Sequence, residues 1–253
     1  LVQVLEIIPT ESQLAGLMAG VNRHKSSGED CVPGDPYKSC PEESARLFFP
    51  LIAQVMLAFH EPVQWLGGIS HEILKGQSSP SLTSNYRYVL LADVIGNVYH
   101  RYLRSLLVPH LNSYLLSTKC GGFLRRGTDF AILYMQVFVN FCEAQGFDYG
   151  ISFFDAAGAF ESLQRFFVFG DKLSDHMVMG MLDKCEISRD CFADFVEVLA
   201  EPNAFHESGV APVLDKLTQA SHATSWMSCD GLDTFVLATQ GSKPGDPLGD
   251  IIF

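Results

Sequence analysis

Apolar residues recur at intervals of three and four over most of the chain, and this spacing predicts amphipathic helices. Prolines, glycines and capping residues indicate where these helices begin and end. Pro50 is expected to kink one helix or to lie near its boundary, Pro109 to end another, and Thr128 to cap a third. We therefore expect helices at residues 11–21, 44–59, 93–107, 129–144, 157–167, 171–185, 188–201 and 209–223.

Short apolar runs bounded by turn residues are fewer, and they predict strands. A strand is expected at residues 150–154, and residues 73–92 indicate an extended run, a turn, and then a second extended run or a helix start. Residues 234–241 are β-like, and residues 241–253 form a turn that enters a helix, with Pro247 near its first turn. Many helices with a few strands indicate an α+β fold that is mostly helical.

The composition is that of a folded chain with a hydrophobic core. Of the 253 residues, 47% are hydrophobic, and the longest apolar runs are interrupted well before the ~20 residues that a membrane crossing needs, so no membrane span is expected. Seven scattered cysteines without a Cys-x-x-Cys spacing indicate reduced thiols rather than a zinc site. The eight histidines show no catalytic or metal-binding spacing.

The charge of the chain is acidic overall but unevenly distributed. A formal net charge of -12 argues, taken alone, against a nucleic-acid partner, because neutralising phosphates requires Lys and Arg. The segment from residue 87 to residue 126 is locally basic, however, and Asp93 is its only acidic residue. This segment is either a solvated helix face or the electrostatic footprint of a partner. Its basic residues are Arg87, Arg101, Arg104, Lys119, Arg125 and Arg126.

Two segments combine residue types that suit a binding site. In YGISFFDAAGAFESL, Asp155 stands between an apolar run and a helix start, where a carboxylate is either a helix N-cap or a metal ligand. In GSKPGDPLGDIIF, glycines, a lysine and a helix entry would let the backbone approach a nucleotide or a template. A simple turn into a helix is the alternative for the second segment.

Five segments, taken together and in this order, resemble the reverse transcriptases of non-LTR retrotransposons. FFDAAGAFESL is similar to the first catalytic motif of the palm, and QGSKPGDPLGDIIF is similar to the next palm motif, Gly-x-x-(Gln or Pro)-Gly-Asp-Pro-Leu. Upstream, three segments resemble the family's Trp-x-x-Gly to Lys-Gly, Tyr-Arg-Pro-(Ile/Val) and Gly-Phe-Arg-x-Gly-Arg-(Ser/Thr)-Thr-Asp segments. They are EPVQWLGGISHEILKG, SNYRYVLLADVIGNVYHRYL and CGGFLRRGTDFAI.

The resemblance implies a right-hand polymerase fragment of the α+β class, with mostly helical fingers and a partial palm that holds a small antiparallel sheet. The fingers are expected over residues 1–148 and the partial palm over residues 149–253. Within the palm, the first catalytic motif is expected at 150–163, a helical insertion at 171–221 and the second motif at 240–253.

The resemblance also implies an activity, which is RNA-templated DNA synthesis. In this reaction two Mg²⁺ ions, or Mn²⁺ in their place, assist the attack of a 3′-hydroxyl on the α-phosphate of a deoxynucleotide. The implied partners are an RNA template, a DNA primer and deoxynucleoside triphosphates, with no membrane. The implied location is intracellular, in cytoplasm and nucleus, and the oligomeric state stays open.

The resemblance assigns roles to individual residues. Asp155 matches the first metal-binding aspartate, the main-chain carbonyl of Ala156 matches the accompanying ligand, and Phe160 matches the bulky residue beneath the nucleotide sugar. Further residues match positions that hold nucleotide, template or phosphate, and for these the alternatives are a surface cation or a plain turn. They are Lys75, Arg87, Arg126, Gln240, Lys243, Gly245 and Asp246.

The chain departs from the family pattern at several positions. Tyr88 stands in place of a Pro, and Leu124 stands where an Arg normally supplies a phosphate contact. The Tyr-x-Asp-Asp motif, which supplies the other metal-binding carboxylates, has no counterpart in the sequence, so we expect a fragment that does not polymerise by itself. The alternative is a non-catalytic helical remnant that acts as a nucleic-acid- or protein-binding module.

Overall fold

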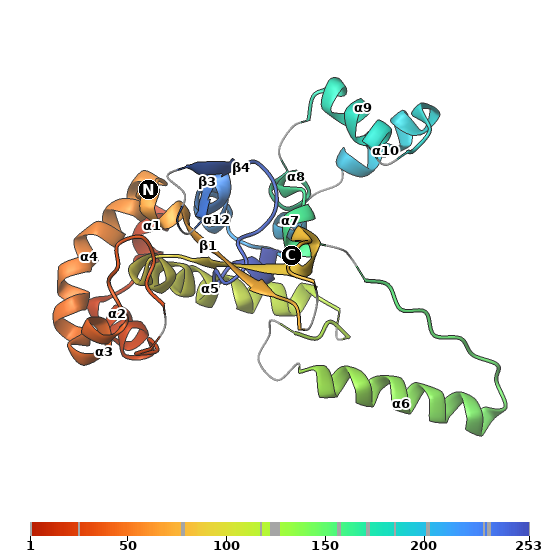
Figure 1. Cartoon of the computed structure of the whole chain (residues 1–253), viewed down its shortest axis with the longest axis horizontal. Coiled ribbons are helices and arrows are strands. Elements are labelled where there is room, and N and C mark those ends of the chain that lie inside the picture. The colour runs from red at the N-terminus through yellow and green to blue at the C-terminus, as the bar shows by residue number, and fades with distance from the viewer. Residues whose placement is uncertain are drawn as a thin grey trace.

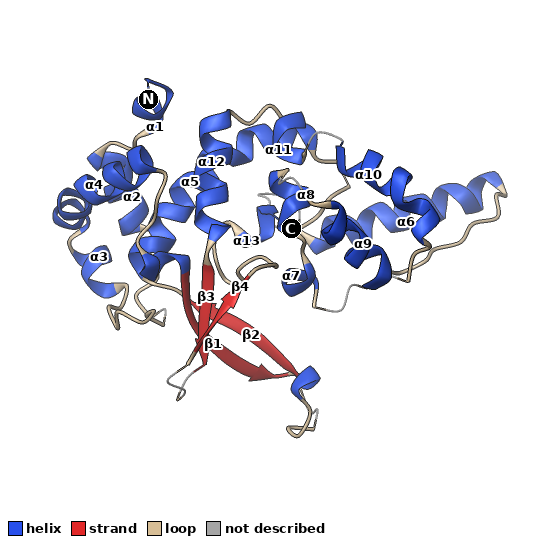
Figure 2. Cartoon of the chain, turned by 90° about the horizontal axis from the view of Figure 1, so that it is seen from above, coloured by secondary structure: helices blue, strands red, loops and turns tan. Residues whose placement is uncertain are grey.

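The chain folds as a mixed α+β structure that is mostly helical and holds one small four-stranded sheet (Figures 1 and 2). The computed structural model describes residues 2–252 apart from 25, 77–78, 117, 122–126, 156–157, 171–172, 185, 201–202, 230 and 232–233. Within this part of the chain, no helix is long and apolar enough to cross a membrane. No disulfide joins the described cysteines, which are Cys31, Cys40, Cys120, Cys142, Cys191 and Cys229.

The N-terminal helices pack as a group against the start of the long central helix. The group comprises α1 (Val2–Ile7), α2 (Glu11–Ala19), α3 (Asp35–Ser39) and α4 (Pro41–Ala58). Thr10 and Gln13 form a capping box at the start of α2, which explains why a weakly patterned segment is helical. Helix α4 continues through Pro50, so Pro50 does not mark a boundary.

The sheet is mixed, and the expectation of an antiparallel sheet is therefore wrong. Strands β1 (Gly67–Leu74) and β2 (Tyr86–Leu91) form an antiparallel hairpin through the turn η2 (Thr83–Asn85), and β3 (Ser225–Cys229) pairs with β4 (Phe235–Ala238) in the same way. Strand β1 runs parallel to β3, which gives the order β2-β1-β3-β4. A parallel pair needs a long crossover, and the helices between β2 and β3 provide it.

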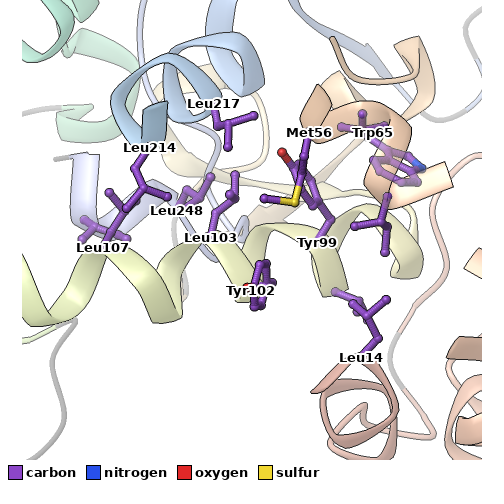
Figure 3. Close-up of a cluster of buried hydrophobic side chains, with 14 of the residues drawn as sticks. Leu14, Met56, Trp65, Tyr99, Tyr102, Leu103, Leu107, Leu214, Leu217 and Leu248 are labelled. Carbon is purple, nitrogen blue, oxygen red and sulfur yellow. The ribbon is translucent and has the colours of Figure 1, made fainter. Parts of the chain in front are cut away.

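The core lies around the central helix α5 (Val94–Tyr114) and α12 (Pro212–Ala223). Helix α5 continues through Pro109, so the expected end at that residue is wrong. Figure 3 shows Leu248, from the segment before α13 (Gly249–Ile252), among the leucines of α5 and α12, and Leu248 is completely buried. Apolar burial of this kind is the main stabilising contribution to the fold.

Helix α6 (Thr128–Gln145) projects from the rest of the molecule together with the extended chain that follows it (Figure 1). Its N-cap is Gly127 rather than the expected Thr128, and it ends at Gly146 in the left-handed conformation, as predicted. Most of its large apolar side chains are exposed, among them Phe130, Leu133, Tyr134, Val137, Phe138 and Phe141.

The strand predicted at residues 150–154 is not formed, and the single helix predicted at 157–167 is replaced by two short ones. Residues 150–154 are extended but belong to no strand, and Phe153 and Phe154 are 81% and 95% exposed. A strand requires a hydrogen-bonded neighbour, and no described strand pairs with this segment. The short helices are α7 (Ala159–Ser162) and α8 (Arg165–Phe169).

The helical pattern between residues 171 and 223 is confirmed. Its three predicted helices correspond to α9 (Asp175–Lys184), α10 (Phe192–Ala200), which follows the turn η3 (Arg189–Cys191), and α12. A short further helix, α11 (Ala204–Glu207), lies between the last two. The 3-10 turn η1 (Val63–Leu66) leads into β1.

Candidate functional site

The loop between β4 and α13, residues 239–248, lies between the β1–β2 hairpin and the short helices α7 and α8. On one side, the main-chain N–H of Leu90 in β2 donates to the Pro244 carbonyl over 3.0 Å. On the other side, the N–H groups of Gly241 and Ser242 donate to the carbonyls of Leu163 and Phe160, each over 2.7 Å. Three of the five segments that carry the family resemblance therefore meet at this loop.

Gly245 allows the loop to approach the hairpin. Its φ of +94° is a backbone conformation that side-chain-bearing residues rarely adopt, and a Cβ at this position would lie 3.2 Å from the Leu90 carbonyl oxygen. Glycine has no Cβ, so it accepts both the angle and the close contact. The turn expected from the Gly-Asp-Pro sequence is confirmed.

A buried ionic network also holds this loop and joins it to α5. The His100 Nδ1 lies 2.6 Å from Asp246 Oδ2, and its Nε2 lies 3.0 Å from Glu61 Oε2, while the exposed fraction of each of these side chains is at most 1%. Lys243 Nζ lies 3.3 Å from Asp246 Oδ2 and donates to the Ser221 carbonyl. The N–H of Leu248 donates to the other Asp246 oxygen over 2.8 Å.

The electrostatics of this network favour its charged forms. Burial lowers the pKa of His100, but the carboxylates of Asp246 and Glu61 outweigh it and raise that pKa to about 9. Burial raises the pKa of Asp246, but His100 and Lys243 outweigh it and hold that pKa well below its usual range. His100 is therefore an imidazolium at neutral pH, and both of its ring N–H groups donate to carboxylates.

A cavity of about 400 Å³ opens between the sheet and the loop. Its floor is one face of the sheet, because the strand registers place Tyr88, Leu90, Ser70 and Cys229 on that face. The loop from Thr239 to Pro244 forms the opposite wall. The cavity thus has an apolar floor and a wall built from the second motif.

The structure brings five of the predicted residues to this loop, including Lys243 of the buried network described above. Asp246 is buried, Gly245 is at the turn, and Gln240 is exposed and accepts a hydrogen bond from the Gln164 side-chain amide over 3.3 Å. Phe160 is half-buried, and its carbonyl is bonded to Ser242. The Asp246 side chain is enclosed by protein and faces His100 and Lys243, and its place near a nucleotide or template stays a prediction.

The other predicted residues lie elsewhere or are not described. Lys75 follows the last residue of β1, and Arg87 pairs with Ile73 near the same end of the hairpin, where both side chains are exposed. Lys75 Nζ donates to the Ser84 carbonyl across the hairpin turn. Ala156 and Arg126 lie outside the described residues.

Asp155 is exposed at the end of the extended segment before α7. It is not the N-cap of that helix, because Gly158 occupies the N-cap position. In the described part of the chain, no group of three or more His, Cys, Asp and Glu side chains comes together as a metal site. The described residues therefore do not fit a two-ion centre by themselves, since Mg²⁺ needs several oxygen ligands in fixed geometry.

Reasoning from the sequence missed Glu61, His100 and Arg165. His100 lies 39 residues from Glu61 and 146 residues from Asp246, so no local spacing connects them. His100 lies in an ordinary helical pattern, and its partners depend on tertiary packing.

Compared with known proteins, the chain matches no protein-family model, and it matches no curated protein sequence.

Proposed function

We propose that the chain is the template- and nucleotide-binding part of an RNA-directed DNA polymerase of the non-LTR retrotransposon type. The support is the resemblance of five sequence segments in one order, together with one structural observation. The two segments that resemble palm motifs are joined by the main-chain hydrogen bonds from Gly241 to Leu163 and from Ser242 to Phe160. Segments of one active site must be neighbours in space, and these two are.

In this proposal the hairpin and the loop bind different parts of the substrates. Lys75 and Arg87 provide cations at the exposed end of the hairpin, where a guanidinium can contact a phosphate in bidentate fashion and an ammonium contacts it as a point charge. The cavity of about 400 Å³ beside Gln240 provides an apolar floor and polar edges for a nucleobase. The buried Asp246 stabilises the conformation of the loop and does not contact the substrate.

The test is binding of the purified chain to a fluorescent RNA-template and DNA-primer duplex, measured by anisotropy over a series of salt concentrations. We expect the logarithm of the association constant to fall linearly with the logarithm of the salt concentration. The double variant Lys75→Ala and Arg87→Ala should reduce the magnitude of this slope by about two, since each phosphate contact contributes about one.

The matched control is the double variant Arg46→Ala and Arg189→Ala. It removes the same charge from exposed positions on other elements, in α4 and η3, and it should leave the slope unchanged. Equal effects of the two double variants would mean that only net charge matters and would remove the hairpin from the site. No binding to the duplex, or binding that is insensitive to salt, would overturn the proposal and favour a protein-binding module.

A further inference from the structure

Arg165, the first residue of α8, uses all of its hydrogen-bond donors inside the protein. Its Nε donates to the Gly241 carbonyl over 2.7 Å. One terminal nitrogen donates to the carbonyls of His222 and Ala238, and the other to the Ser225 hydroxyl and the Gln240 carbonyl. A guanidinium has five N–H groups in a rigid fork, and each of them has an acceptor here.

The acceptors are four main-chain carbonyls and one hydroxyl, and no carboxylate is among them. The Arg165 side chain is buried, and this burial lowers its pKa. An uncompensated buried cation is costly, so the arrangement requires the aligned carbonyl dipoles around it. Because those carbonyls belong to the end of α12, the end of β4 and the following loop, one side chain links all three of these elements to α8.

Arg165 also separates two cavities. It lines the cavity of about 400 Å³ over the sheet and a second one of about 500 Å³ beside α8, and Thr239 and Gln240 line both as well. The guanidinium and this part of the loop are therefore a common wall. A shift of the loop would change the shape of the cavity over the sheet and move Gln240.

We infer that Arg165 is the positioning residue of the candidate site: by holding the loop from Ala238 to Gly241 against α8, it sets the nucleotide-facing wall of the cavity over the sheet. The inference rests on the proposed function. Arg165 does not contact substrate in this role, because its donors are already occupied by the protein. A lysine keeps the charge but has three donors at a single point, so it cannot span the same acceptors.

The test compares wild type with Arg165→Lys in two measurements. The first is hydrogen exchange at the amides of Gly241 and Ser242, which should become faster in the variant because the loop is released from α8. The second is the affinity of the chain for the next complementary deoxynucleoside triphosphate on a primer–template duplex with Mg²⁺. We expect this affinity to fall about tenfold, as for loss of charge-assisted hydrogen bonds, while affinity for the duplex itself is unchanged.

The control is Arg189→Lys. Arg189 also bonds through Nε and a terminal nitrogen, to the two carboxylate oxygens of Asp183, but it lines neither cavity and does not contact the loop, so the nucleotide affinity should be unchanged. If Arg165→Lys fails to fold, Ser225→Ala removes a single acceptor of the same guanidinium and should produce a smaller effect in the same direction.

The outcomes distinguish two claims: that Arg165 holds the loop, and that the position of the loop sets the affinity for the nucleotide. Unchanged hydrogen exchange at the amides of Gly241 and Ser242 would show that Arg165 does not hold the loop. Faster exchange with unchanged nucleotide affinity would overturn the positioning role and leave a purely structural one. If wild type binds neither duplex nor nucleotide, the proposed function fails and the positioning role fails with it, whereas the exchange data still show whether Arg165 holds the loop.

Discussion

His100 Nδ1 and Asp246 Oδ2 lie 2.6 Å apart in the interior of the protein, and they join the central helix α5 to the loop before α13. Glu61 bonds to the opposite nitrogen of the same ring. A buried imidazolium between two carboxylates can move little. Water does not reach these charges, so each charge is stabilised only by its partners. The loop conformation is therefore coupled to the protonation of one histidine.

Replacing Asp246 with Asn should destabilise the fold strongly. The amide keeps the shape but removes the negative charge that both His100 and Lys243 face, and breaking a buried pair in this way costs about 3 kcal/mol or more. Urea unfolding measures the loss. Asp183→Asn, in an exposed pair with Arg189, should unfold at nearly the wild-type urea concentration, and equal losses in the two variants would contradict the role of burial.

Stability should fall on the alkaline side as His100 loses its proton. Its pKa is about 9 in the folded chain and 6.5 ordinarily, so its contribution is complete below pH 6.5 and is lost as the pH rises through 9. A pKa raised in this way stabilises the folded chain by an amount on the order of a few kcal/mol. Urea unfolding between pH 6 and 10 should show this decline in wild type, and His100→Gln should flatten it.

On the acid side the sign is reversed for Asp246. Its folded pKa is held below the ordinary value of 3.8, so its contribution is present above that value and is lost as the pH falls below it. Asp246→Asn should therefore be less sensitive to acid than wild type. An acid transition that is identical in wild type and variant would show that other carboxyl groups govern it.

Gly245→Ala should destabilise the folded chain by straining the loop between β4 and α13. At a φ of +94° alanine is strained, and its Cβ would press on the Leu90 carbonyl at 3.2 Å, which together cost about 1–3 kcal/mol. Gly16→Ala in α2 is the control, since nothing lies within 4 Å of the added Cβ. That control should be stabilised by up to about 1 kcal/mol through helix propensity.

Asp155→Asn should leave the unfolding midpoint unchanged. Asp155 is exposed in an extended segment and does not cap α7, so its removal disturbs no packed structure. A fall in the midpoint similar to that expected for loss of a helix cap, about 1 kcal/mol, would contradict this placement. The variant therefore offers a way to test Asp155 in nucleotide binding without a change in stability.

Most helices could be predicted from the sequence because helix formation depends on neighbours three and four residues away. The spacing of apolar residues depends only on nearby positions, and it predicts α2, α4, α5, α6, α9, α10 and α12. The glycine that ends α6 and the turn at Gly245 are local signals as well. The hairpin of β1 and β2 was visible only in part, because the first extended run was predicted from residue 73, near the end of β1, and the second was left open between a strand and a helix start. Helix ends were less certain, since packing lets α4 and α5 continue through Pro50 and Pro109.

The strands and the site depended on partners that are distant along the chain. An apolar run at 150–154 predicts a strand only if another strand lies beside it, and here none of the described strands does. The short strand β3 gave little signal of its own and forms because β1 and β4 flank it.

By itself, then, the sequence determined the helical pattern, the α+β class and the order of the segments that resemble a reverse transcriptase. Only the tertiary structure decided that the second motif packs between the hairpin and α8, that His100 and Asp246 form a buried pair, and that Arg165 holds the loop. Local spacing specifies backbone hydrogen bonds within a few residues, whereas these contacts join residues far apart in the chain and exist only once the core has brought their elements together.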